Sequence, residues 1–413
     1  MSVIDHFPAV VRQTLVLAVL ASVVAAAGAD WPRFRGPDGR GLAPASHPPI
    51  EWNDGAGQTK NVAWKVRLPG RGCSCPLVLG DRVLVSCSDG YRQDQLSLNC
   101  YDARDGRRIW QRTLWATGRT MTHPTIAPAA PSPVSDGKRV YVLFSSNDVA
   151  CYDLAGNLIW LRGLMLDYPN ASNSLGMASS LVIAEETVIA KLENDSQSLT
   201  VALHAEDGTT RWVVDRPAVA SWSTPVLWRA ADGNTEVVLQ SVRGFTAYDL
   251  ATGKQRWQFA AGGSAQASVV AADGLLLLPA RGVTAVKPRV GRNPEVVWDN
   301  NRLRCNTATP LVYQDRVYVL SGTILKCAEL ATGKLRWQLR LKGRRFSASP
   351  VLAGDRLYIT GEDGVTHVVD IGGTKGKVVG TGKLGETILA TPAVGDDALL
   401  IRSHQHLWKI ARP

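Results

Sequence analysis

The sequence of 413 residues lacks an apolar run long enough to span a membrane. Its longest apolar run, residues 14–27, is shorter than the ~20 residues that a membrane-spanning helix needs. The mean hydropathy is close to zero, which excludes a protein with several membrane spans. Because 45% of the residues are hydrophobic and only 20% are charged, the composition is that of a folded, globular chain.

The apolar run has the features of a secretion signal. Arg12 precedes it, and Ala27-Gly28-Ala29 matches a small-x-small cleavage site. We therefore predict a signal peptide at residues 1–29, a mature chain that begins at Asp30, and a periplasmic or secreted protein without a transmembrane domain. No cysteine follows the run, so a lipid anchor is not expected. An uncleaved anchor is the alternative.

The sequence also lacks the common motifs of catalysis and metal binding. It has no Gly-x-Ser-x-Gly elbow, no His-Glu-x-x-His helix and no Cys-x-x-Cys spacing typical of zinc sites. His404 and His406 share one face of a predicted strand, but they lack a third ligand, so we predict no metal site. The seven cysteines include no adjacent pair, and Cys87 with Cys100 is the favoured disulfide.

Acidic residues are fewer than basic ones, 36 against 46, which gives a net charge of +10. This balance favours anionic partners such as phosphates, acidic polysaccharide or lipid. The basic residues are scattered and are not interleaved with aromatic residues, which argues against a nucleic-acid groove. A solvated surface without a partner is the simpler interpretation of the charge.

What the sequence contains in abundance is tryptophan, glycine and proline, with 13, 38 and 22 residues. Many of them belong to a repeat whose end reads as Tyr-Asp-Leu-Ala-Thr-Gly-Lys-x-x-Trp or a variant. Its copies are residues 101–110, 152–160, 204–212, 248–257 and 329–337. Each unit begins with Ser/Thr-Pro-Val or a variant, followed by a turn and an alternating Val/Tyr/Leu run, as at Ser349-Pro350-Val351.

Each unit predicts four short antiparallel strands, because Thr-Gly and Asp-Gly pairs favour tight hairpins. Tandem units of about 40 to 50 residues predict an all-β fold, an eight-bladed β-propeller of four-stranded antiparallel blades. The last unit lacks a fourth strand, and residues 61–66 resemble a lone fourth strand, so we expect the N-terminal strand to close the ring. Seven blades are the alternative. We expect an extended arm at residues 30–60, one propeller domain at 61–413 and a monomer.

Seven tryptophans fall at the ends of units, where an indole can pack on the next blade. They are Trp64, Trp110, Trp160, Trp212, Trp257, Trp298 and Trp337. Cys100, Cys151 and Cys327 lie two residues before the acidic residue that ends the third strand. Alanine fills this position in other units, which indicates a small buried residue.

The repeat, best kept at residues 247–257 and 328–337, resembles the pyrroloquinoline-quinone (PQQ)-repeat, or quinoprotein-like, family of bacterial propellers. The resemblance covers residues 61–410 and implies the propeller fold. The family includes quinoprotein dehydrogenases, which hold PQQ and Ca²⁺ in the channel and carry a disulfide between adjacent cysteines, and also non-enzymatic scaffolds. This chain has no adjacent cysteines and no recognisable Ca²⁺ ligand set, so we expect no cofactor, with PQQ and calcium as the alternative.

A ligand is expected where loops lead into the first strands at the mouth of the channel. Long loops at residues 111–130 and 161–178 are typical of functional loops on a rigid scaffold. The candidate residues at the mouth are polar, basic or aromatic: Arg71, His123, Asn170, Asn173, Trp222, Gln266, Asn306 and Arg345. They would suit an anionic or carbohydrate ligand or an extended peptide, whereas a mouth filled with water alone is the simpler alternative.

We therefore predict a secreted, non-enzymatic propeller that acts as a protein- or ligand-binding scaffold in the cell envelope. A relative implied by the resemblance is the propeller lipoprotein of outer-membrane protein assembly, from which this chain departs because it lacks the lipid-anchor cysteine. The alternatives are a PQQ- and Ca²⁺-dependent alcohol or sugar oxidoreductase and a carbohydrate-binding propeller of the envelope.

Overall fold

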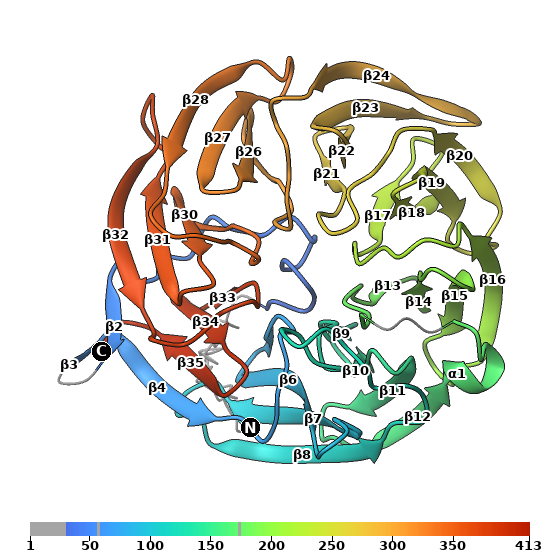
Figure 1. The fold of residues 1–413 in the computed structure, drawn as a ribbon, viewed down its shortest axis with the longest axis horizontal. Helices are drawn as coiled ribbons and strands as arrows, with labels where there is room; N and C mark the ends of the chain where they lie inside the picture. The colour runs from blue at the N-terminus through green and yellow to red at the C-terminus, as the bar shows by residue number, and fades with distance from the viewer. Residues whose placement is uncertain (1–29, 56–57, 172–174) are drawn as a thin grey trace, which may run out of the picture.

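Residues 30–55, 58–171 and 175–413 are described by the structure, a computed structural model. The predicted signal peptide, residues 1–29, lies outside the described residues. The described residues form eight β-sheets that follow one another in chain order around a common centre (Figure 1). Seven sheets consist of four strands, and the eighth carries three further short strands from the N-terminal segment. The prediction of an all-β propeller with four-stranded antiparallel blades is confirmed.

Each blade begins near the centre with a short first strand that follows the Ser/Thr-Pro pair of most repeats (Figure 1). The first strands are β5 (Leu77–Leu79), β9 (Val134–Ser135), β13 (Val182–Ala184), β17 (Val226–Arg229), β21 (Val270–Ala272), β25 (Leu311–Tyr313), β29 (Val351–Ala353) and β33 (Ala393–Gly395). The second strands carry the alternating hydrophobic run and are mostly buried. They are β6 (Arg82–Asp89), β10 (Arg139–Leu143), β14 (Thr187–Leu192), β18 (Thr235–Ser241), β22 (Leu275–Pro279), β26 (Arg316–Ser321), β30 (Arg356–Thr360) and β34 (Ala398–Arg402).

The third strands end near the acidic residue of the repeat, and the fourth strands form the outer edge of each blade (Figure 1). The third strands are β7 (Gln95–Asp102), β11 (Asp148–Asp153), β15 (Ser198–His204), β19 (Gly244–Asp249), β23 (Val283–Arg289), β27 (Ile324–Glu329), β31 (Val365–Asp370) and β35 (His406–Ile410). The fourth strands are β8 (Arg108–Trp115), β12 (Leu158–Gly163), β16 (Thr210–Arg216), β20 (Gln255–Phe259), β24 (Arg292–Asn300), β28 (Leu335–Arg340), β32 (Lys377–Lys383) and β4 (Val62–Arg67). One short helix, α1 (Leu164–Asp167), follows β12.

The ring is closed by the N-terminal strand β4, which completes the last blade. It pairs antiparallel with β35, and Trp64 lies opposite Lys409. The predicted closure by both ends of the chain is confirmed. Such closure leaves no open blade edge at the junction between the ends. In the described part of the chain, no helix has the length and apolarity needed to cross a membrane.

Five of the seven repeat tryptophans donate an indole hydrogen bond to the next blade, whereas Trp257 donates to Glu236 of its own blade. The indole N–H of Trp212 donates to the Leu250 carbonyl at 2.9 Å, and that of Trp298 donates to the Leu330 carbonyl at 2.7 Å. The same bond links Trp64 to Ala103, Trp110 to Leu154 and Trp160 to Ala205. In each case the acceptor follows the third strand of the next blade. These tryptophans therefore act as the predicted contacts between blades.

The position opposite six of the seven repeat tryptophans holds a small residue, whereas Trp64 lies opposite Lys409. Cys100, Cys151 and Cys327 pair with Trp110, Trp160 and Trp337, and alanine pairs with Trp212, Trp257 and Trp298. All three cysteines are fully buried, as predicted for this slot. A small side chain leaves room for the indole, which lies over the sheet.

The predicted disulfide between Cys87 and Cys100 is wrong. All seven cysteines are free, and the register of β6 and β7 places Cys100 opposite Leu84 and Cys87 opposite Ser97. The two cysteines therefore lie three pairs apart along the ladder. The prediction failed because it rested on the two strands being neighbours, whereas the register of the strands decides which residues face each other.

One blade has no tryptophan of its own, and the N-terminal segment supplies the missing ring. Gly380 in β32 lies opposite Val368, where other blades have the tryptophan. The strand β2 (Trp52–Gly55), which forms a hairpin with β3 (Gln58–Lys60), pairs with β32, and Trp52 stacks on Tyr358 with a centroid distance of 6.4 Å. In other blades the equivalent tyrosine packs on the blade's own tryptophan. The arm is thus part of the propeller core.

Gly333 and Gly322 provide a matched test of the tryptophan contact, because both have a positive φ, +67° and +60°, and both lie in turns of one blade. A Cβ on Gly333 would lie 2.4 Å from the Trp298 ring, whereas a Cβ on Gly322 would meet nothing within 4 Å. Gly322→Ala should lower the free energy of unfolding by about 1–2 kcal/mol through backbone strain alone. Gly333→Ala should lower it by a further ~1–3 kcal/mol through overpacking. Urea denaturation of both variants measures the difference, and equal losses would contradict the proposed contact.

Candidate functional site: a cup at one end of the central channel

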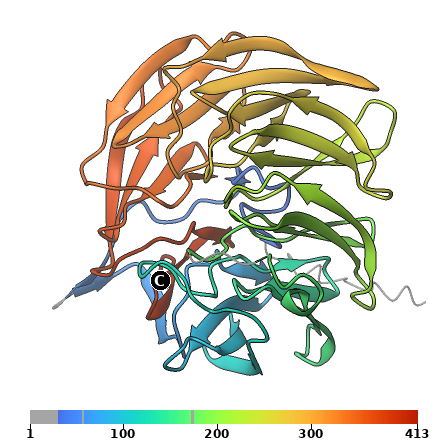
Figure 2. The same cartoon turned by 45° about the vertical axis from the view of Figure 1, so that its right-hand side comes forward.

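The N-terminal segment lies across the centre of the ring (Figure 2). Trp31 exchanges backbone hydrogen bonds with Val78 in β5, and the carbonyl of Pro32 accepts the N–H of Ser135 in β9. On the opposite side, strand β1 (Leu42–Ala43) pairs with β29. Residues 33–41, which we call the arm loop, connect these contacts. The predicted extended arm is therefore a series of turns here, with hydrogen bonds from Gly36 to Arg33 and from Gly41 to Arg35.

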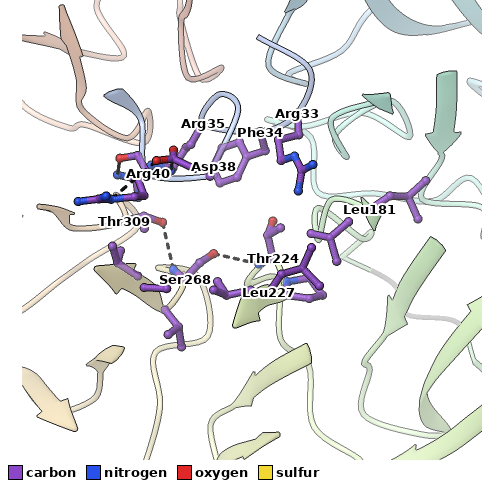
Figure 3. Close-up of a pocket in the computed structure, with 17 residues that line it drawn as sticks. Arg33, Phe34, Arg35, Asp38, Arg40, Leu181, Thr224, Leu227, Ser268 and Thr309 are labelled. Carbon is purple, nitrogen blue, oxygen red and sulfur yellow. Dashed lines mark hydrogen bonds and ion pairs between the residues drawn. The ribbon is translucent and has the colours of Figure 1, made fainter. Parts of the chain in front are cut away.

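The arm loop divides the channel into two cavities. Phe34 lines both of them, together with Thr224, Ser268 and Thr309 from the first-strand loops. The larger cavity, which we call the cup, has a volume of about 570 Å³, within the range of small-molecule binding sites. The smaller one, which we call the arm cavity, has a volume of about 60 Å³ and lies between the arm loop and the first strands (Figure 3).

A ring of hydroxyl groups surrounds the wall of the cup. Each Ser or Thr that precedes a first strand accepts the backbone N–H of the equivalent residue in the preceding blade, at 2.9–3.2 Å. The acceptors are Ser132, Ser180, Thr224, Ser268, Thr309, Ser349 and Thr391, and the donor to Ser132 is Cys75. All eight of these residues line the cup. The ring gives the cup a fixed polar wall.

Five of the eight residues predicted at the mouth line the cup: Arg71, His123, Trp222, Gln266 and Arg345. Of the other three, Asn170 is exposed outside the cup, and Asn306 lines a separate open hollow with Arg281 and Arg304. Asn173 lies outside the described residues.

Arg71 and Trp222 hold the long loops of the mouth in place. Arg71 Nη2 donates to the Pro124 carbonyl at 2.8 Å, and His123 N–H donates to the Leu175 carbonyl at 3.1 Å. The indole N–H of Trp222 donates to the Gly176 carbonyl at 2.7 Å. Because its one donor is occupied, Trp222 offers a ligand the apolar face of its ring.

Arg345 and Gln266 are two exposed polar residues that line the cup. Arg345 is 76% exposed, and its Nε lies 3.6 Å from Glu362 Oε1. Glu362 also accepts a hydrogen bond from Ser347. Gln266 Oε1 accepts a hydrogen bond from Thr307 at 3.0 Å and keeps its amide nitrogen for other contacts.

Sequence reasoning missed several residues of the cup. Phe34 of the arm loop lines the cup, and so do Glu362 and His404. Arg402 lies behind the wall, fully buried, and donates to Ser74 Oγ and to the Ser86 carbonyl. The Ser/Thr-Pro pairs were recognised only as strand starts. These pairs recur once in most repeats, always before a first strand, and this regular position was the signal that they line one common wall.

The cup carries a positive charge. Arg71 and Arg345 line it, Arg402 lies behind it, and Glu362 is the one carboxylate among its lining residues. Burial lowers the pKa of His404, and the nearby Arg71 and Arg402 lower it further. His404 is therefore neutral at pH 7. Arg71 and Arg345 thus carry the positive charge of the lining.

The cup offers no site built for a metal ion or a reactive thiol. Among the described residues, no group of three or more His, Cys, Asp or Glu side chains could hold a metal ion. His404 Nε2 contacts the Thr125 carbonyl, whereas His406 Nδ1 lies 2.6 Å from Glu386. Burial raises the pKa of the Cys75 thiol to about 12, so this thiol is protonated at neutral pH.

The hydroxyl ring can be tested at Thr309, which is 3% exposed. Thr309→Val removes the acceptor of the Ser268 N–H and leaves this donor without its partner. We expect a loss of about 1–3 kcal/mol in the free energy of unfolding, measured by urea denaturation. Thr309→Ser keeps the hydroxyl and should lose only the ~1 kcal/mol of a buried methyl group. A valine variant as stable as the serine variant would contradict a stabilising role of the ring.

Comparisons with known proteins place this architecture among related folds. The family model described as "Outer membrane protein assembly factor BamB" matches residues 56–196, 195–345 and 321–412. The structure is similar to that of BamB from Moraxella catarrhalis, with a TM-score of 0.60, 15% sequence identity, and coverage of 84% of this chain and 99% of that chain. A comparison with the sequences of curated proteins gives no match.

Two dehydrogenases have similar structures as well. The quinohemoprotein alcohol dehydrogenase from Comamonas testosteroni has a TM-score of 0.65 and 13% identity, over 93% of this chain and 81% of that chain. A europium-containing methanol dehydrogenase has a TM-score of 0.64 and 12% identity, over 86% of this chain and 88% of that chain. At these identities the likeness concerns the fold alone, so the site must be judged by its own residues.

Proposed function

Because the chain belongs to the protein family of the outer membrane protein assembly factor BamB, we propose that it is a non-enzymatic binding protein of the cell envelope. Its cup is the binding site, and the ligand is an extended segment of a partner protein that carries acidic side chains. The observation that carries this proposal is the charge of the cup, which is lined by two arginines and one carboxylate.

The polar groups of the cup support binding of a peptide rather than a reaction. The wall hydroxyls and the Trp222 indole are already engaged with the backbone, so they hold the shape of the site. The exposed guanidinium of Arg345 is free to turn toward a carboxylate, because its contact with Glu362 is 3.6 Å long. Arginine binds carboxylates in a planar, two-pronged geometry, which suits acidic side chains.

The alternative of a PQQ- and Ca²⁺-dependent oxidoreductase has less support from these residues. Ca²⁺ takes six to eight oxygen ligands, usually with several carboxylates. Among the described residues, Glu362 is the only carboxylate that lines the cup, and it already faces Arg345 and Ser347. The residues present do not fit a Ca²⁺-PQQ pair, and we derive no reaction step through it.

Arg345 and Arg344 provide a matched test of the cup. Both side chains are exposed, but only Arg345 lines the cup. The probe is a fluorescein-labelled hexapeptide of alternating Glu and Gly, and its Gln analogue serves as the uncharged probe. Fluorescence anisotropy at low salt should show binding of the Glu peptide by residues 30–413. Arg345→Gln should weaken this binding about tenfold through the loss of a charged hydrogen bond.

Arg344→Gln should bind within twofold of the unchanged protein, and added salt should weaken the binding of all three proteins. Equal losses in both variants would place the peptide outside the cup. Stoichiometric binding of PQQ with Ca²⁺ and dye reduction with alcohols or sugars would replace the proposal with the oxidoreductase. Binding of neutral glycans that disappears in Trp222→Ala, with no binding of the peptide, would favour the carbohydrate alternative.

A further inference from the structure

The arm cavity is lined by several arginines and lies on the side of Phe34 that faces away from the cup. Three of the six arm-loop residues that line it are Arg33, Arg35 and Arg40. The remaining wall consists of the first-strand segments 181–182, 224–227 and 268–271 with Thr309. Figure 3 shows Arg33 on one side of Phe34 and Arg35, Asp38 and Arg40 on the other. Asp38 is the one acidic residue among the lining residues.

Arg35 is buried, and no described residue forms an ion pair with it. Its side chain is among the largest that are fully buried, with the residue 1% exposed. Nη2 donates to the Arg40 carbonyl at 2.9 Å, whereas Nε and Nη1 have no hydrogen-bond partner among the described residues. Burial lowers the pKa of Arg35 to about 9, and the nearby Asp38 only partly opposes this shift. A buried cation of this kind is costly unless a counter-charge accompanies it.

Arg33 and Arg40 also have donors that are not used. The Nε atom of each is buried and has no hydrogen-bond partner in the described part of the chain. Arg40 makes only long ionic contacts, 3.9 Å to Asp38 and 3.9 Å to Asp273. Both carboxylates have side chains about half exposed, so water screens these contacts. The cavity therefore lacks negative charge relative to its three guanidinium groups.

The conformation of the arm loop holds the Arg35 side chain in place. Trp31, which is 1% exposed, anchors its start, and turn hydrogen bonds close at Gly36 and Gly41. Both glycines have a positive φ, and Arg35 itself is held at +63°, a conformation that costs a non-glycine residue about 1 kcal/mol or more. A Cβ on Gly41 would lie 3.1 Å from Arg35 Nε, so the glycine makes room for the guanidinium. The Arg35 guanidinium is thus held in place before any ligand binds.

We propose that the arm cavity binds one small free oxyanion, such as inorganic phosphate, through Arg35 with Arg33 and Arg40. The unused N–H groups are strong donors to such an oxyanion. The cavity volume of about 60 Å³ exceeds the ~15 Å³ that one water needs, but it leaves no room for the rest of a larger phosphate ester. The site is separate from the cup and does not depend on its ligand.

The test measures how phosphate changes the thermal stability of residues 30–413. Phosphate is raised from zero to 20 mM while sodium chloride keeps the ionic strength constant. A ligand that binds only the folded state should raise the melting temperature by on the order of 2 °C for each tenfold increase above its dissociation constant. Equilibrium dialysis with radiolabelled phosphate should give one bound ion per chain. The measured quantity is the rise in melting temperature that phosphate causes. Each variant without phosphate is therefore its own reference.

Arg35→Met should abolish the phosphate increment and the bound ion. Because this variant could fail to fold, Arg40→Gln and Arg33→Gln, which alter half-buried side chains, should each reduce the affinity for phosphate at least fivefold. Arg345→Gln in the cup is the control and should keep the full increment. The proposal is overturned by a chain that shows no increment at constant ionic strength. It is overturned equally by an increment that survives in both glutamine variants of the arm loop, or by one that disappears in Arg345→Gln.

Discussion

The hydroxyl ring is the interaction on which the arrangement of the blades depends. Each bond joins the backbone of one blade to a side chain of the next, so it fixes the blades where they converge. At the junction where the ring closes, the hydroxyl is replaced by Cys75, whose Sγ lies 3.9 Å from the Pro392 carbonyl. Thiols are weak hydrogen-bond donors. Arg402 crosses this same junction from β34 to the Ser86 carbonyl in β6, and the pairing of β4 with β35 completes the blade beside it.

The hydroxyl ring explains why the charged groups of the channel lie on loops and not on the ring itself. Because the hydroxyls already serve the backbone, the charge of the cup comes from loops that lead into the blades, at Arg71 and Arg345. The charge of the arm cavity comes from the arm loop. The net charge of +10 is therefore not spread over solvated surface alone, and part of it faces the two ends of the channel. Each end therefore has its own source of positive charge, which is the loops between blades at the cup and the arm loop at the arm cavity.

The repeat predicted the fold because each unit carries its own strand, turn and packing signals. Trp212 and Gly253 lie in different units, yet each repeats at a fixed offset, so their contact follows from the period. The arm loop does not repeat, and no local pattern indicated that Phe34 separates two cavities. The cup combines residues from loops of different length, which explains why Asn306 lies outside it although its unit position matched. The Cys87–Cys100 prediction failed because register, which strand proximity does not specify, decides which residues face each other.

The arm cannot be a dispensable addition to the propeller. Gly380 and Gly382 in β32 let the arm approach closely, because a Cβ on Gly380 would lie 2.1 Å from the Ile50 carbonyl oxygen and a Cβ on Gly382 would lie 1.8 Å from the Trp52 ring. Trp52 therefore packs where the repeat omits its own tryptophan, and the loss of the arm would expose Tyr358. The same segment is also anchored at β5 and β29, so both ends of the arm loop are held by blades. The buried Arg35 thus belongs to the folded core, and the half-buried Arg33 and Arg40 line the same cavity.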